Sequence, residues 1–151
     1  MATTSTDTTS GTSGTSSGTT TPTVTISAYS HVNLQVTDFD RAMDFYCNTM
    51  GFEPIPRPDF GGFPGAWLQH GTAQIHLSVV EKMAERIGLP HLALMVPLDE
   101  FQNTCAALDA RGINWIAPPN SREDFGVTVW AAFIEDPDGN IIELTNAGPI
   151  Y

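Results

Sequence analysis

Three of the four histidines in this 151-residue chain, and one glutamate, lie in short segments where polar and apolar residues alternate. These four residues are His31, His76, His91 and Glu143. Alternation with a period of two is typical of a half-buried strand, so each side chain should point away from its apolar neighbours. Imidazole nitrogen and carboxylate oxygen are donors that Zn, Ni, Co, Fe or Mn accept. We therefore expect a divalent metal site on these four residues.

The four positions form two equivalent pairs because the chain contains an internal repeat. Two pairs of segments match in pattern: 31–36 with 91–96, and 74–77 with 141–144. The match makes His31 equivalent to His91, and His76 equivalent to Glu143. Such a repeat predicts two similar units side by side. The fourth histidine, His70, precedes a glycine in an expected turn, and we assign it no role.

Each unit is expected to contain one helix and several strands in the order βαβββ. In the first unit we expect strands at 31–36, 66–69 and 73–79, a helix from the N-cap Asp38 to Gly51, a loop at 54–64 and a short helical piece at 81–87. In the second we expect strands at 91–96, near Trp115, at 127–134 and at 140–145, and a helix that ends at Gly112. Asp99 and Gln102 have capping-box spacing at the start of that helix, and Asp138-Gly139 is typical of a hairpin turn.

These elements predict an α+β fold in which two βαβββ modules form a cupped, partly open mixed sheet with the helices outside. Residues 1–25 are almost wholly Thr, Ser and Gly, a composition that predicts a disordered tail. We expect a single domain over 26–149, with module one at about 26–88 and module two at about 89–147.

Charge and composition exclude several classes of partner. The formal net charge of −11 argues against nucleic acid and anionic membranes. The sequence has neither a membrane-spanning apolar stretch nor a secretory signal pattern. Cys47 and Cys105 fall inside expected helices and are interpreted as small apolar residues in a reducing compartment. These features favour a cytoplasmic protein that acts on a small molecule.

The same segments carry a family resemblance. The chain resembles the vicinal oxygen chelate superfamily, which includes glyoxalase I, extradiol dioxygenases and bleomycin-binding proteins. The segments that carry the resemblance are His31-Val-Asn-Leu-Gln-Val, Ala42-Met-Asp-Phe-Tyr, Met50-Gly-Phe, Gln74-Ile-His-Leu, His91-Leu-Ala-Leu and Ala132-Phe-Ile-Glu-Asp-Pro-Asp-Gly-Asn-Ile-Ile-Glu-Leu. The resemblance implies paired βαβββ modules and a metal held by the first and last strands of each module. It also implies a homodimer, with the site either within one chain or across two.

Three positions depart from the glyoxalase I pattern. That enzyme usually has a carboxylate or amide where this chain has His76, and Arg where Gln35 stands. It also has an Asn-Trp-Gly run, which helps hold glutathione, where this chain has Val79-Val-Glu-Lys. The metal identity and the use of glutathione therefore stay open.

Three functions are compatible with these residues. In the first, a lyase or isomerase, the metal chelates two adjacent substrate oxygens and Glu143 moves a proton. In the second, an Fe(II) dioxygenase, His31, His91 and Glu143 form a facial triad and His76 lines the pocket. The third is a drug-binding resistance protein. Candidate substrate contacts are Arg57, in a loop that could cover the cup, and the aromatic pair Trp67 and Trp130.

Overall fold

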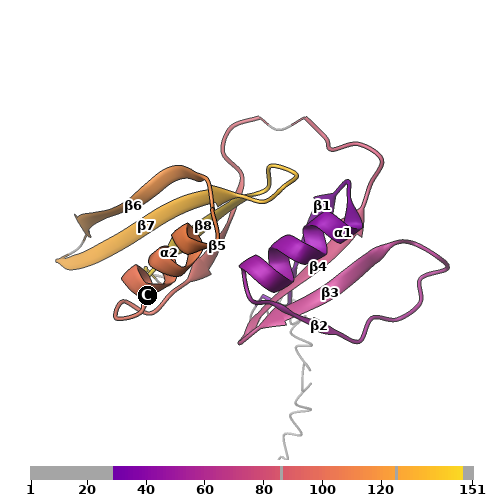
Figure 1. Ribbon diagram of the computed structural model, residues 1–151, viewed down its shortest axis with the longest axis horizontal. Helices are drawn as coiled ribbons and strands as arrows, with labels where there is room; N and C mark the ends of the chain where they lie inside the picture. The colour runs from indigo at the N-terminus through magenta and orange to yellow at the C-terminus, as the bar shows by residue number, and fades with distance from the viewer. Residues whose placement is uncertain (1–28, 86, 125, 148–151) are drawn as a thin grey trace, which may run out of the picture.

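The internal repeat appears in the computed structural model as two modules with the same order of elements (Figure 1). The structure describes residues 29–147 except 86 and 125. Module one contains β1 (Val32–Val36), α1 (Phe39–Met43), the π-helical turn η1 (Asp44–Thr49), β2 (Glu53–Ile55), β3 (Gly65–His70) and β4 (Ala73–Val79). Module two contains β5 (His91–Met95), α2 (Phe101–Ala110), β6 (Trp115–Asp124), β7 (Val127–Glu135) and β8 (Ile141–Thr145).

Each module forms its own four-stranded mixed sheet. The strand order is β1-β4-β3-β2 in one sheet and β5-β8-β7-β6 in the other. The first and last strands of a module are adjacent and parallel, and the other neighbours are antiparallel. The predicted α+β fold of two βαβββ modules is thus confirmed. In this topology the strands that begin at or next to His31 and His91 are the neighbours of the strands that carry His76 and Glu143, respectively.

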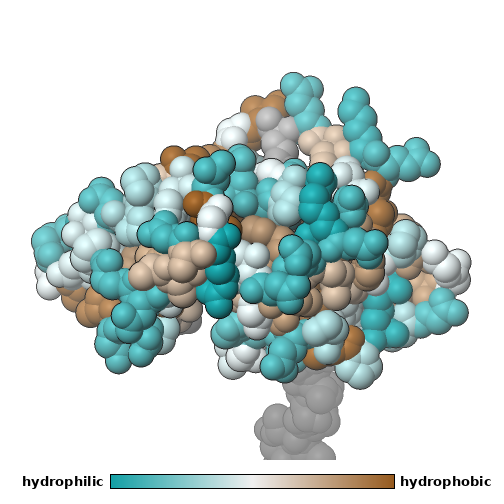
Figure 2. Space-filling view, viewed as in Figure 1, coloured by the Kyte–Doolittle hydropathy of each residue, from teal (hydrophilic) through white to brown (hydrophobic). Residues whose placement is uncertain are grey.

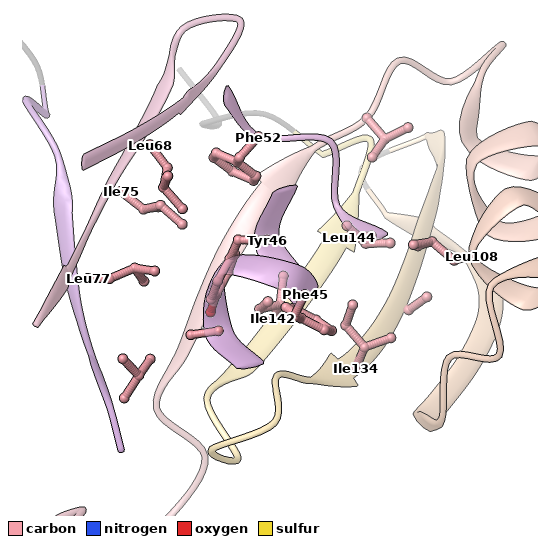
Figure 3. Close-up of a cluster of buried hydrophobic side chains, with 14 of the residues drawn as sticks. Phe45, Tyr46, Phe52, Leu68, Ile75, Leu77, Leu108, Ile134, Ile142 and Leu144 are labelled. Atoms are coloured by element: carbon pink, nitrogen blue, oxygen red, sulfur yellow. The ribbon is translucent and has the colours of Figure 1, made fainter. Parts of the chain in front are cut away.

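One hydrophobic cluster joins the two modules (Figure 3). Tyr46 of η1 lies between the apolar faces of the two sheets, and its ring contacts Phe45 and Phe52 edge-on. From module two the cluster includes fully buried Ile134 and Ile142. Burying side chains of this size typically contributes about 1.5–3 kcal/mol each. The shared core therefore holds both sheets with their polar faces turned away from it, and Figure 2 shows mainly hydrophilic side chains on the outer side of the helices.

A polar clamp fixes the module-two hairpin against the start of α1. The Oδ1 atom of Asp138 accepts hydrogen bonds from the Thr37 amide and hydroxyl groups and from Arg41 Nη2, the last at 3.0 Å. Tyr46 donates its hydroxyl hydrogen to Asp136 Oδ2 at 2.8 Å. Since these bonds connect different modules, they set the relative position of the two sheets.

Local signals were confirmed at most helix ends. Asp38 caps α1 by accepting from the Arg41 amide, and Gly51 and Gly112 follow the helices with φ values of 77°. The capping box at Asp99 and Gln102 was wrong, because α2 begins after Glu100 and has no side-chain cap.

Two further expectations differ from the structure. The helical piece at 81–87 was wrong: the described residues of that segment form bends and irregular backbone. Strand β2 was not predicted because it contains Pro54, a residue that usually argues against a strand. Proline is tolerated there because β2 is an edge strand.

The predicted tail at 1–25 lies outside the described residues, and the domain limits stay predictions. Within the described part of the chain, no helix is long and apolar enough to span a membrane.

Candidate metal site

In module one, three rings stack on the polar face of the sheet. His76 is paired with Asn33 of β1 on one side and with Trp67 of β3 on the other. The His76 ring lies flat against Trp67, with centroids 4.2 Å apart, and against His31, with centroids 3.8 Å apart. His31 and His76, two of the four predicted ligands, therefore lie side by side. Because the two imidazoles are stacked, they do not aim their lone pairs at one point, and exposed His31 would turn to share an ion with His76.

One ring nitrogen of His76 is placed to donate its lone pair to a metal ion. Its Nε2 is buried and has no hydrogen-bond partner among the described residues. Burial lowers the pKa of His76 below its ordinary value, and the nearby His31 and Arg57 lower it further. A neutral imidazole with an unpaired nitrogen is the form that binds a divalent metal. The chemistry of His76 thus fits a metal ligand.

In module two, His91 meets Glu143 directly. His91 Nε2 lies 3.0 Å from Glu143 Oε2, and His91 Nδ1 lies 2.9 Å from the Leu89 carbonyl oxygen. A carbonyl oxygen only accepts, so Nδ1 carries a hydrogen, and in the neutral ring Nε2 presents a lone pair to the carboxylate. A proton or a metal cation between these atoms would satisfy both. Backbone support of Nδ1 is also the usual way in which a ligating histidine is oriented.

His31 is supported in a similar way. Its Nδ1 lies 3.0 Å from the hydroxyl oxygen of the preceding Ser30. This contact leaves Nε2 as the nitrogen available to a ligand. All four candidate donors therefore fit the borderline metals in chemical type, namely three imidazole nitrogens and one carboxylate.

The two pairs do not come together within the described residues of one chain. No group of three or more His, Cys, Asp or Glu side chains there is arranged to hold a metal ion. His31 and His91 line opposite sides of a cavity of about 620 Å³ between the modules, but His76 and Glu143 do not line it. A single chain thus offers two half-sites, each with two donors.

The candidate substrate residues are placed differently from one another. Arg57 and Trp67 line a cavity of about 490 Å³ together with His31 and His76. Trp130 instead faces α2, where its ring packs 5.8 Å from Phe101, and its amide donates to Asn146 Oδ1. The structure therefore places Trp67 beside the module-one half-site and Trp130 in the packing under α2.

Sequence reasoning missed Phe133. This residue is paired across the sheet with Glu143, as Trp67 is with His76, and its ring contacts His91 edge-on at 5.6 Å. Strand alternation could have found it, because Phe133 and Trp130 are separated by an odd number of residues and so face opposite sides of β7. Phe133 is the module-two counterpart of Trp67.

A comparison with family models identifies the superfamily of the chain. Residues 28–144 match the model of the Glyoxalase/Bleomycin resistance protein/Dioxygenase superfamily. The chain belongs to this superfamily. The predicted resemblance is thus confirmed, and the prediction of a glyoxalase-type enzyme is borne out at the level of the family.

Named relatives and solved structures of this superfamily resemble the chain over most of its length. "Glyoxylase I 4" of Arabidopsis thaliana is 31% identical over 129 residues, covering 80% of this chain and 71% of the relative. "Probable lactoylglutathione lyase" of Synechocystis sp. is 32% identical, covering 76% of this chain and 91% of the relative.

Among solved structures, a putative glyoxalase family protein from Bacillus anthracis has a TM-score of 0.68 and 26% identity, covering 82% of this chain and 98% of that one. The fosfomycin resistance protein FosX from Listeria monocytogenes, crystallised with Mn(II) and a dihydroxypropylphosphonic acid, has a TM-score of 0.67 at 21% identity, covering 83% of this chain and 95% of that one. The likeness to FosX shows a shared fold.

Proposed function

We propose that this chain is a metal-dependent lyase or isomerase of the glyoxalase I type, which acts on a small substrate with two adjacent oxygens. The observation that carries the proposal is the pair of half-sites. His31 and His76 in one module stand at the positions of His91 and Glu143 in the other, and the buried His76 Nε2 has no hydrogen-bond partner in the described part of the chain. The relatives named as lactoylglutathione lyases support the reaction class.

We further propose that two copies of the chain complete each site. His31 and His76 of one copy would hold the metal with His91 and Glu143 of another, since the described part of one chain brings only two donors together. Strands β1 and β5 lie at the edges of their sheets, and β5 exposes Met95 to 63%. Open edges and exposed apolar side chains favour association with a second copy. Two-fold pairing would form two identical sites per dimer.

The chain's own residues then divide the chemical work. A bound divalent ion supplies Lewis acidity, which polarises the substrate oxygens and lowers the pKa of the adjacent C–H. The Glu143 carboxylate accepts that proton and returns it to the neighbouring carbon. His91, held through Nδ1 by the Leu89 carbonyl, keeps Nε2 3.0 Å from Glu143 Oε2 and would hold a bound ion beside that carboxylate. Trp67 and Phe133 wall the polar faces of the two half-sites.

The test combines elemental analysis with turnover. Protein purified without added metal is analysed and assayed with methylglyoxal and glutathione, with Zn, Ni, Co, Fe or Mn restored in turn. Glu143→Gln keeps the size of the side chain and removes the base, so we expect turnover to fall by about 10²–10⁴-fold while part of the metal is retained. His70→Gln, outside the half-sites, is the matched control and should keep both.

Two results would contradict the proposal. Full turnover in the Glu143→Gln variant would remove Glu143 from the reaction. Oxygen uptake with Fe(II) and a catechol, undiminished by His76→Ala, would instead support the dioxygenase alternative, in which His76 only lines the pocket.

A further inference from the structure

The module-one half-site opens into a cavity with an aromatic wall. Phe60 and Phe63, from the loop between β2 and β3, line it together with Trp67, and the Phe60 ring lies 6.1 Å from the Trp67 ring. Phe60 and Phe63 are 54% and 50% exposed. Large apolar side chains gathered at a cavity mouth are typical of a ligand contact. This wall offers flat apolar surface to a planar group.

The charge in this cavity is positive, although the chain as a whole has a net charge of −11. Arg57 lines the cavity, and no Asp or Glu does so among the described residues. The whole chain has only six Lys and Arg residues against 17 Asp and Glu residues. A cavity lined by an arginine and by no described carboxylate therefore favours a negatively charged ligand.

Arg57 is held in place before any ligand arrives. Its Nη2 donates to the Phe63 carbonyl oxygen at 2.7 Å, and its guanidinium lies 4.9 Å from the centre of the Phe60 ring. The loop itself is folded by Asp59, whose Oδ1 accepts from the Gly61 amide at 2.9 Å. A guanidinium has five N–H donors, so the contact to Phe63 leaves others for a ligand. Fixing the fork in advance reduces the entropy lost on binding.

We infer that Arg57 and the aromatic wall select a substrate in which a carboxylate stands next to a planar apolar group. The carboxylate pairs with the Arg57 fork, the planar group lies against Phe60, Phe63 and Trp67, and the oxygens to be activated face His31 and His76. This inference deepens the proposed function, on which it rests for the orientation of the substrate. The carboxylate belongs either to the substrate itself or to the peptide part of a glutathione conjugate whose planar group is on the sulfur, and both sources offer the same group to Arg57.

Binding to the full-length protein tests the inference. Isothermal titration compares trans-cinnamate with its neutral amide, trans-cinnamamide, and with S-benzylglutathione, using protein as isolated and after treatment with EDTA. We expect Arg57→Gln to weaken binding of the carboxylate ligand about tenfold or more and to leave cinnamamide within about twofold. Arg57→Lys, a point charge without the fork, should fall between. Arg111→Gln removes the same charge at the end of α2 and is the matched control.

The comparison of ligands shows which molecule supplies the carboxylate. Loss of cinnamate affinity identifies a free small acid, and loss for S-benzylglutathione alone identifies the conjugate. The inference is overturned if neither cinnamate nor S-benzylglutathione depends on Arg57 more than on Arg111, or if Arg57→Gln weakens cinnamamide as much as it weakens the carboxylate ligands. Because titration requires no turnover, Arg57-dependent binding without glyoxalase activity would refute the proposed reaction and leave this assignment standing.

Discussion

Trp67 and Phe133 occupy the same position in the two modules: Trp67 is paired across its sheet with His76, and Phe133 is paired with Glu143. The Trp67 ring stacks flat on an imidazole, whereas the Phe133 ring meets His91 edge-on. Each half-site therefore has two donors and one aromatic neighbour, which limits the rotation of the donors and excludes water from one side.

This arrangement predicts that one substitution on β7 lowers turnover and another lowers stability. Phe133→Ala removes the ring beside His91, so turnover should fall at least about tenfold because the donors lose their fixed geometry. Trp130→Ala removes packing against Phe101 and should cost about 2–4 kcal/mol of unfolding free energy. Steady-state kinetics and urea unfolding of both variants measure the difference. The assignment of faces is refuted if Trp130→Ala is the variant that loses activity without loss of stability.

In the Asp138 clamp, the two charged residues Asp138 and Arg41 are predicted to contribute unequally to the free energy of unfolding. The side chain of Asp138 is 2% exposed and that of Arg41 is 49% exposed. Asp138→Ala should destabilise the protein by about 1.5–3 kcal/mol, because it removes the hydrogen bonds that the nearly buried carboxylate accepts from Thr37 and Arg41. Arg41→Ala should cost less than about 1 kcal/mol, since an exposed partner contributes little. Urea unfolding at equilibrium checks both values, and equal losses would contradict the clamp.

Gly65 is predicted to be intolerant of any side chain. A Cβ atom at this position would lie 2.1 Å from the Leu77 carbonyl oxygen, in the backbone of the neighbouring strand. Gly65→Ala should therefore cost about 3 kcal/mol or more, because β3 has to move away from β4. Gly61→Ala is the matched control: it meets open space at φ +71°, so its cost should be about 1 kcal/mol. Thermal unfolding of the two variants gives the comparison, and similar losses would refute the close approach.

The lowered pKa of His76 predicts a dependence of stability on pH. In metal-free protein, NMR should show a pKa of His76 below its ordinary value of 6.5, because partial burial disfavours the charged ring. The unfolded chain then binds this proton more tightly than the folded chain does. The unfolding free energy should therefore fall as the pH drops below about 6.5, and it should level off below the folded-state pKa. His76→Phe should reduce this loss, and an unchanged pH profile in that variant would contradict the prediction.

The sequence predicted the parts of the site that follow from strand alternation and repetition. His76, His91 and Glu143 each have apolar neighbours on both sides, and His31 is followed by the alternating segment 32–36, so their common face could be assigned without coordinates. The family resemblance also implied that the ligands come from the first and last strands of each module, and the structure shows that these two strands are adjacent. A repeat does not show whether the ligands of its two units come together within one chain. The separation of the two half-sites is therefore visible only in the structure.

Other features depend on contacts between distant residues. The clamp at Asp138 forms with Thr37 and Arg41, about a hundred positions away, and no local pattern marks it. Gly65 could be taken for an ordinary loop glycine, since its constraint comes from the backbone of β4. Trp67 and Trp130 lie on roughly matching strands of the two modules, but the Trp67 ring stacks on His76 whereas the Trp130 ring packs against Phe101.

Mixing two inactive variants tests most directly whether two copies complete each metal site. One variant carries His31→Ala and His76→Ala, and the other carries His91→Ala and Glu143→Gln. If sites form across copies, each mixed dimer keeps one intact site, so unfolding and refolding the two together should restore about a quarter of the wild-type metal content and turnover, as random pairing requires. If mixing restores neither metal nor activity, although dimers form, the sites do not lie between copies and the account is wrong.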